Sequence, residues 1–170
     1  MKLGYRIARS VIYLALGILA LTLQGNINGL SIYFGVAAVT AAGMSLIYLF
    51  LHFDENMARE NIIEMMMDGF SGLIIFTYPQ SDNQFFIIVF SFWIAIVGVL
   101  MLTSGLFNKS NKDFLWFYAL LGISYIVSGF SIMHVTKETS GMIGYLIGFV
   151  LIIYSGANIW LLTKRKQEIY

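Results

Sequence analysis

The sequence predicts an all-α integral membrane protein in which six transmembrane helices form three parallel two-helix repeats around a pseudo-threefold axis. Hydrophobic residues make up 59% of the 170 residues and charged residues only 11%, against about 45–50% and about 25% in soluble domains. The charged residues gather in short segments between six long apolar runs. Glycines also recur 26 or 27 positions apart in each third of the chain: Gly17 and Gly43, Gly72 and Gly98, Gly129 and Gly156. Such a regular spacing indicates an internal repeat.

Each apolar run is long enough to cross a bilayer as a helix. The runs contain 17 to 23 residues, near the roughly 20 residues that cross about 30 Å of hydrocarbon at 1.5 Å per residue. They cover residues 7–23, 30–51, 62–78, 85–107, 114–133 and 142–163. The segments between them are too short to hold another domain. We therefore expect a single membrane domain over residues 1–170, with repeats at about 5–51, 60–107 and 113–163.

The basic residues predict that both chain ends are cytoplasmic. Nine of them fall on the side of the termini and one, Lys137, falls on the opposite side, as the positive-inside rule requires. The nine are Lys2, Arg6, Arg9, Arg59, Lys109, Lys112, Lys164, Arg165 and Lys166. The start of the chain resembles a signal peptide, but its apolar run supplies the first helix of the first repeat and no A-x-A-like site follows. We expect it to remain as a span. Because each repeat has two spans, all three repeats enter the membrane with the same polarity.

Aligning the repeats on their first glycine places side chains in layers. One layer contains Tyr13, Asp68 and Tyr125, and a second contains Arg9, Glu64 and Leu121. An unpaired carboxylate inside the bilayer costs about 2.5–3.5 kcal/mol and usually faces protein or water. We therefore expect the two tyrosine hydroxyls to donate to Asp68, and Arg9 to pair with Glu64 or to reach Asp68. This predicted intramembrane polar cluster consists of Arg9, Tyr13, Glu64, Asp68 and Tyr125.

Two interpretations of the cluster are open. A structural ion pair between Arg9 and Asp68 would pin the helices together, and Glu64 is also favoured near the start of its helix by the helix dipole. Alternatively, Asp68 handles protons or ions. We favour the structural interpretation, because structural ion-pair networks also contain strongly perturbed ionisable groups.

The glycines are predicted to be contact surfaces between helices. Small residues allow close approach, which matters where lipid competes with any apolar face. On the last run, glycines recur at multiples of four positions. The predicted helix-packing glycines are Gly17, Gly43, Gly72, Gly98, Gly129, Gly144, Gly148 and Gly156. Their partner is either a neighbouring helix of the same chain, a second copy, or another membrane protein.

The sequence contains no pattern that indicates an enzyme, a cofactor or a metal site. Cysteine is absent, which excludes disulfides and thiol chemistry. The two histidines are predicted at opposite membrane faces, and no phosphate loop, H-E-x-x-H or G-x-S-x-G motif occurs. The basic residues form a fringe that sets the topology rather than a groove, which argues against nucleic-acid binding. The expected partner is the lipid bilayer.

The middle repeat resembles the HdeD-like family of small bacterial membrane proteins, named for an acid-resistance membrane protein. The resemblance rests on DGFSGLIIFTYP at 68–79, on FWIAIVG at 92–98, and on the link GLFNKS at 105–110. The chain departs from the family pattern in the other repeats, where Gln24 and Thr136 stand in place of the proline. The resemblance implies a bacterial inner-membrane protein that is linked to acid or envelope stress, with no catalytic residues to transfer.

Two functions follow from this reading. The first is a non-enzymatic inner-membrane protein of the HdeD type in acid or envelope-stress tolerance, acting through protein association within the bilayer. The alternative is a small transporter or proton-linked channel in which Asp68 takes up a proton during transport. A membrane-embedded enzyme is disfavoured, because no set of nucleophile, base or metal ligand is present.

Overall fold

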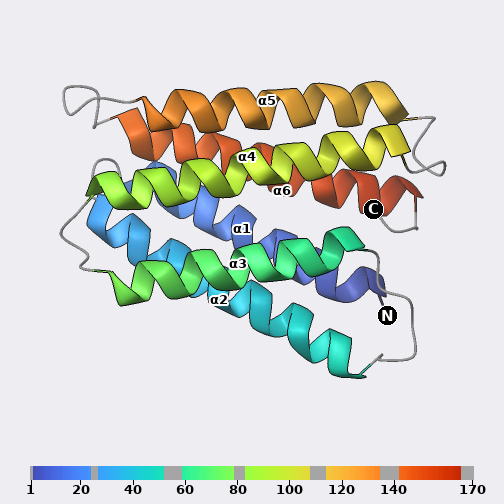
Figure 1. The fold of residues 1–170 in the computed structure, drawn as a ribbon, viewed down its shortest axis with the longest axis horizontal. Helices are drawn as coiled ribbons and strands as arrows, with labels where there is room; N and C mark the ends of the chain where they lie inside the picture. Colours follow the sequence, from blue (N-terminus) through green and yellow to red (C-terminus); the bar gives the residue numbers. More distant parts are fainter. Residues whose placement is uncertain are drawn as a thin grey trace.

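The computed structural model describes residues 2–23, 27–51, 59–78, 83–107, 114–134 and 142–165, and these residues form six α-helices. The helices are α1 (Lys2–Leu23), α2 (Ile27–Leu51), α3 (Arg59–Thr77), α4 (Asn83–Phe107), α5 (Leu115–Met133) and α6 (Ile143–Arg165). Each corresponds to one predicted apolar run, so the predicted all-α architecture is confirmed. The start of α1 and the end of α6 lie at the same end of the bundle (Figure 1). The predicted connections, including Pro79, fall largely outside the described residues, as do the basic residues Lys109, Lys112, Lys137 and Lys166.

Five of these helices are long and apolar enough to cross a membrane, namely α1, α2, α4, α5 and α6. Helix α3, which contains Glu64 and Asp68, does not meet this criterion within the described residues. Both carboxylates point inward, with 8% and 0% of each residue exposed. The large side chains exposed on α3 from Ile62 onward, including Ile63, Phe70 and Leu73, are apolar. The described outer surface of α3 is therefore largely apolar, and Glu64 and Asp68 face protein.

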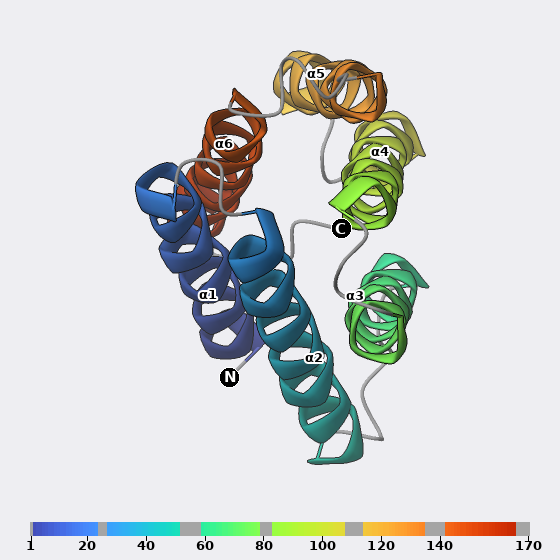
Figure 2. The ribbon, with the colours of Figure 1, turned by 90° about the vertical axis from the view of Figure 1, so that its left-hand side faces the viewer.

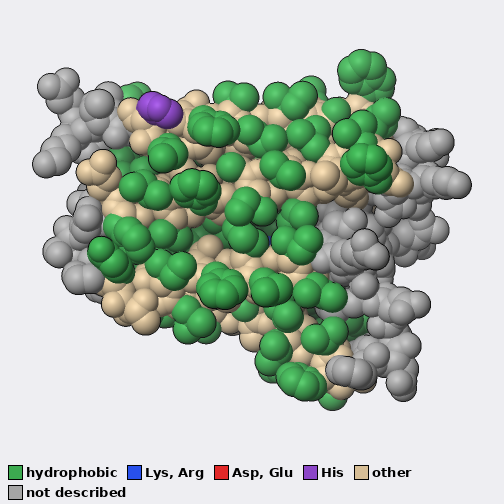
Figure 3. Space-filling model, viewed as in Figure 1, with side chains coloured by type: hydrophobic (Ala, Val, Ile, Leu, Met, Phe, Trp, Pro, Cys, Tyr) green, Lys and Arg blue, Asp and Glu red, His purple; other side chains and the backbone are tan. Residues whose placement is uncertain are grey.

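The exposed surface of the bundle is rich in large apolar side chains. Ile47 is 59% exposed on α2, Phe92 56% on α4, and Phe149 57% on α6. Figure 3 shows hydrophobic side chains spread over one whole face, with no lysine, arginine, aspartate or glutamate visible among the residues described there. Such a surface suits lipid, in which helices satisfy their own backbone hydrogen bonds. The chain is thus a multi-pass membrane protein.

The six helices follow one another in chain order around a ring, and α6 returns beside α1 (Figure 2). The most extensive helix contacts join α4 to α5, α1 to α6, and α2 to α3. The closest packing therefore occurs between different predicted hairpins rather than inside one of them. The contact between α1 and α6 joins the first and last helices of the described chain.

Each of these three contacts contains a glycine whose added Cβ atom would meet the backbone of the neighbouring helix. A Cβ atom on Gly17 would lie 3.1 Å from the carbonyl oxygen of Gly148, and one on Gly72 would lie 3.0 Å from that of Gly35. A Cβ atom on Gly129 would lie 2.7 Å from the carbonyl oxygen of Ser91. A larger side chain at any of these glycines would push the helices apart. Close approach of this kind is the main way in which helices gain packing energy in lipid.

The other predicted packing glycines do not all behave alike. A Cβ atom on Gly98 would lie 2.6 Å from the carbonyl oxygen of Gly122, which the sequence analysis did not select. Gly43 and Gly156 differ from the expectation, because no described atom lies within 4 Å of their Cβ positions. Gly144 is buried. Equivalent repeat positions therefore contact a neighbouring helix in α4 and face open space in α2 and α6.

Candidate functional site

The guanidinium of Arg9 on α1 lies at the centre of a buried polar cluster. Its Nε donates to Oδ2 of Asp68 at 2.8 Å, and its Nη1 donates to Oε2 of Glu64 at 3.0 Å. Both carboxylates lie on α3, one helical turn apart, so they project from the same face. Only 9% of the Arg9 side chain is exposed. Because the backbones of α1 and α3 are not packed together within the described residues, these ion pairs bridge two helices across the interior.

Asp68 is completely enclosed and accepts hydrogen bonds from three side chains. Tyr13 OH and Trp93 Nε1 donate to its Oδ1 at 2.9 Å and 2.8 Å, while Arg9 occupies Oδ2. The donors come from α1 and α4, and the exposed fraction of Asp68 is 0%. Charge-assisted hydrogen bonds to a carboxylate are about twice as strong as neutral ones. The sequence folds so that the most buried charge in the cluster has partners on both oxygens.

Tyr154 on α6 connects the cluster to the last helix. Its hydroxyl accepts a hydrogen bond from Nη1 of Arg9 at 2.6 Å and donates to Oε1 of Glu64 at 3.4 Å. Cζ of Arg9 also lies 5.8 Å from the Tyr154 ring and 5.4 Å from the Tyr13 ring. Both distances are within the range of cation–π attraction, which is strongest where water is excluded.

Aromatic rings shield the cluster from one side. The ring of Trp93 lies 5.0 Å from that of Tyr13, 5.5 Å from that of Tyr154 and 5.5 Å from that of Phe34, between ring centres. These contacts connect α4 with α1, α6 and α2. In such a low-dielectric environment the hydrogen bonds to Asp68 are stronger than in water, and an unpaired charge is correspondingly more costly.

The predicted cluster and the observed one overlap, with one clear difference. Arg9, Tyr13, Glu64 and Asp68 are joined by direct hydrogen bonds. The expectation that Tyr125 also donates to Asp68 is wrong, since its buried hydroxyl has no hydrogen-bond partner among the described residues. Its ring instead lies 6.1 Å from that of Tyr154. The second donor to Oδ1 is Trp93.

Trp93 and Tyr154 were missed because the repeat alignment compared only the first helix of each pair. Both residues belong to second helices, α4 and α6. One signal was present in the sequence: Trp93 lies in the middle of its apolar run, away from the membrane interface where tryptophan usually collects. A buried indole N–H or phenol hydroxyl normally has a hydrogen-bond partner. Arg6, which was counted with the basic fringe, is also buried.

The charges of the cluster determine what it can do chemically. Two carboxylates share one guanidinium, so in their ordinary ionised forms the three groups carry one net negative charge. A single proton on Asp68 would neutralise these three groups. Within the described ranges no group of three histidine, aspartate or glutamate side chains is arranged to hold a metal ion. The arrangement suits either permanent cross-linking of helices or the uptake of one proton.

The family comparison covers the middle of the chain. A family described as a short repeat of unknown function, DUF308, matches residues 70–134. HdeD-type proteins carry this repeat. No curated protein and no solved structure shows a significant match. The matched segment contains Trp93 and Tyr125, but Arg9, Glu64 and Asp68 all lie before it.

Proposed function

We propose that this chain is a non-enzymatic inner-membrane protein of the HdeD type, which contributes to acid or envelope-stress tolerance as a stable helical scaffold. The enclosure of Asp68 carries the scaffold part of the proposal. A carboxylate that has 0% exposure and three donors is held in place rather than presented to a substrate. The resemblance of the middle repeat to the HdeD-like family, together with the DUF308 match, supports the physiological role.

The proposal includes a sixth span and a pseudo-threefold arrangement. Helix α3 has 19 residues, which suffices for a span at about 1.5 Å per residue, and its carboxylates are paired inside the bundle. The threefold relation is supported by the close glycine contacts that recur between α1 and α6, α2 and α3, and α4 and α5. In this arrangement residues 1–170 form one membrane domain of three repeats.

We place both termini in the cytoplasm. This orientation rests on the nine basic residues that the sequence assigns to one side, and on the position of both ends at the same end of the bundle (Figure 1). Reporter fusions at the C-terminus test the assignment. A green fluorescent protein fusion should fluoresce and an alkaline phosphatase fusion should be inactive; the opposite pattern would reverse the orientation.

A small proton-linked transporter or channel is the second candidate, and the series of hydrogen bonds from Asp68 through Arg9 to Tyr154 and Glu64 favours it. Glu64 is 8% exposed whereas Asp68 is fully enclosed, and Tyr154 contacts both Arg9 and Glu64. In this candidate, Asp68 would take up and release a proton inside the bundle. Transport would require these hydrogen bonds to break and re-form during each cycle.

Asp68→Asn separates the two candidates. In proteoliposomes, a transporter variant should lose proton flux while it remains folded. If the protein is a scaffold, the wild type and the variant should both show only the proton flux of empty liposomes, and the variant should have a lower unfolding temperature. Acid survival of a deletion strain that carries each form then tests the physiological role. Wild-type flux well above empty liposomes that Asp68→Asn abolishes would overturn the scaffold proposal.

A further inference from the structure

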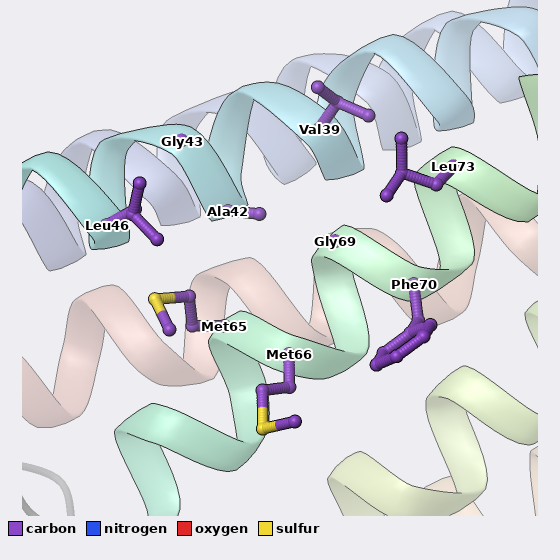
Figure 4. A pocket seen from close by; sticks show the side chains of 9 residues that line it. All are labelled: Val39, Ala42, Gly43, Leu46, Met65, Met66, Gly69, Phe70 and Leu73. Carbon is purple, nitrogen blue, oxygen red and sulfur yellow. The ribbon is translucent and has the colours of Figure 1, made fainter.

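An apolar groove lies between α2 and α3 on the outer surface of the bundle (Figure 4). It encloses about 380 Å³, within the range of small-ligand sites. Residues from both helices line it, including Val39, Gly43, Leu46, Met65, Gly69 and Phe70. We propose that this groove, hereafter the α2–α3 groove, binds one acyl chain of a phospholipid.

The groove exists because α2 and α3 separate along their length. They are closest near Gly72, whose Cβ position lies 3.0 Å from the carbonyl oxygen of Gly35. One turn earlier on α3, the Cβ position of Gly69 is 3.6 Å from Cβ of Ala42, an ordinary contact. Beyond this point the two helices diverge toward the C-terminal end of α2 (Figures 1 and 2). The space beside Gly43 is therefore left without a helix neighbour.

The equivalent region of the α4–α5 pair is closed. Gly98 holds the position that corresponds to Gly43, and its Cβ position is 2.6 Å from the carbonyl oxygen of Gly122. Toward the end of α4, the Cβ position of Gly105 lies 2.6 Å from Cβ of Tyr118. The α4–α5 pair thus fills with helix backbone the place that the α2–α3 pair leaves open.

The chemistry of the groove favours a hydrocarbon chain. Every lining side chain is apolar, and the rim residues Leu46, Met66 and Phe70 are 43%, 52% and 59% exposed. The rim continues into the apolar outer surface, where the surrounding medium is lipid. Leu46 and Met65 face one another across the space in Figure 4. The unbranched, flexible methionine side chain adapts readily to an irregular occupant.

The size of the groove argues against the helix of a second copy. From Val39 to Leu46 the groove follows eight residues of α2, a length of roughly 10 Å at 1.5 Å rise per residue. A transmembrane helix of a second copy extends for about 30 Å, so it would meet this groove over only about a third of its length. A single chain of methylene groups fits within the space without further separation of α2 and α3.

Photo-crosslinking tests the proposal on the full chain in detergent micelles. The probe is a phosphatidylethanolamine with a diazirine in one acyl chain, and adducts are mapped by mass spectrometry. Adducts should concentrate on Leu46, Met65 and Met66, and an excess of unlabelled phosphatidylethanolamine should remove them. Gly43→Leu should remove most of these adducts, because its side chain occupies the space that the acyl chain would fill and the displaced chain packs equally well in the surrounding lipid or detergent.

Gly156→Leu on α6 is the matched control, since Gly156 has the equivalent repeat position and equally open surroundings but lies outside the groove. It should leave the groove adducts unchanged. If Gly43→Leu does not fold, the competition measured on the wild type decides alone. Adducts spread evenly over the lipid-facing surface of α5, groove adducts that resist competition, or crosslinks between two copies at the groove would each overturn the proposal.

Discussion

Replacing Arg9 by methionine should be the most destabilising change in the polar cluster. The substitution keeps an unbranched side chain but removes the cation between Asp68 and Glu64, which are 0% and 8% exposed. The net charge of the three groups changes from −1 to −2 inside the protein. Breaking a buried ion pair by removing one partner costs about 3–5 kcal/mol, since a buried charge is left uncompensated. The loss of cation–π contacts with Tyr13 and Tyr154 adds to this effect.

The charge argument also predicts the order of the variants. Glu64→Gln preserves the pair between Arg9 and Asp68, brings the cluster to zero net charge, and should cost about 1 kcal/mol. Asp68→Asn also gives zero net charge, but its amide NH2 group replaces an oxygen that accepts a hydrogen bond from Arg9 or Trp93. Its loss of stability should therefore lie between those of Glu64→Gln and Arg9→Met. The free energy of unfolding, from far-ultraviolet circular dichroism during titration with sodium dodecyl sulfate, measures all three. A smaller loss for Arg9→Met than for Glu64→Gln would refute the reasoning.

Two further pairs of variants test single contacts by the same measurement. Tyr13→Phe removes a donor to Asp68 and should cost about 1.5–3 kcal/mol. Tyr125→Phe removes a buried hydroxyl that has no partner in the described structure, so it should not destabilise the protein; equal losses for the two variants would contradict the hydrogen-bond assignment. Gly98→Ala places a methyl group 2.6 Å from a backbone oxygen and should lower the free energy of unfolding by about 1–3 kcal/mol. Gly156→Ala should not lower it. A Gly98→Ala variant as stable as the wild type would show that α4 and α5 are less closely packed.

The sequence was sufficient to predict the helices and much of the cluster, because both depend on properties that a repeat makes visible. Apolar length determines a span, and charges inside a span must find partners. The alignment of the first helices therefore predicted that Arg9, Tyr13 and the α3 carboxylates lie close together. The same alignment could not show that Trp93, from a second helix, takes the place expected for Tyr125.

Helix-to-helix contacts were less predictable, because a glycine pattern gives spacing without direction. Gly43, Gly98 and Gly156 are equivalent in the sequence, yet only Gly98 is pressed against a neighbouring helix. The difference depends on how far each pair of helices diverges, which is set by the packing of many side chains together. Similarly, Arg6 and Arg9 precede an apolar run as topology signals do, and only the fold shows that both are buried.

The contact between α1 and α6 has a consequence for biosynthesis. Arg9 enters the membrane with the first helix, 55 residues before Glu64 and 145 residues before Tyr154. Until those segments emerge from the ribosome, the guanidinium has neither its anions nor its phenol, and Gly17 has no helix to pack against. The nascent protein therefore passes through a period in which its first helix is poorly held, and we expect chaperones or quality-control proteases to act on it then rather than after the last helix inserts.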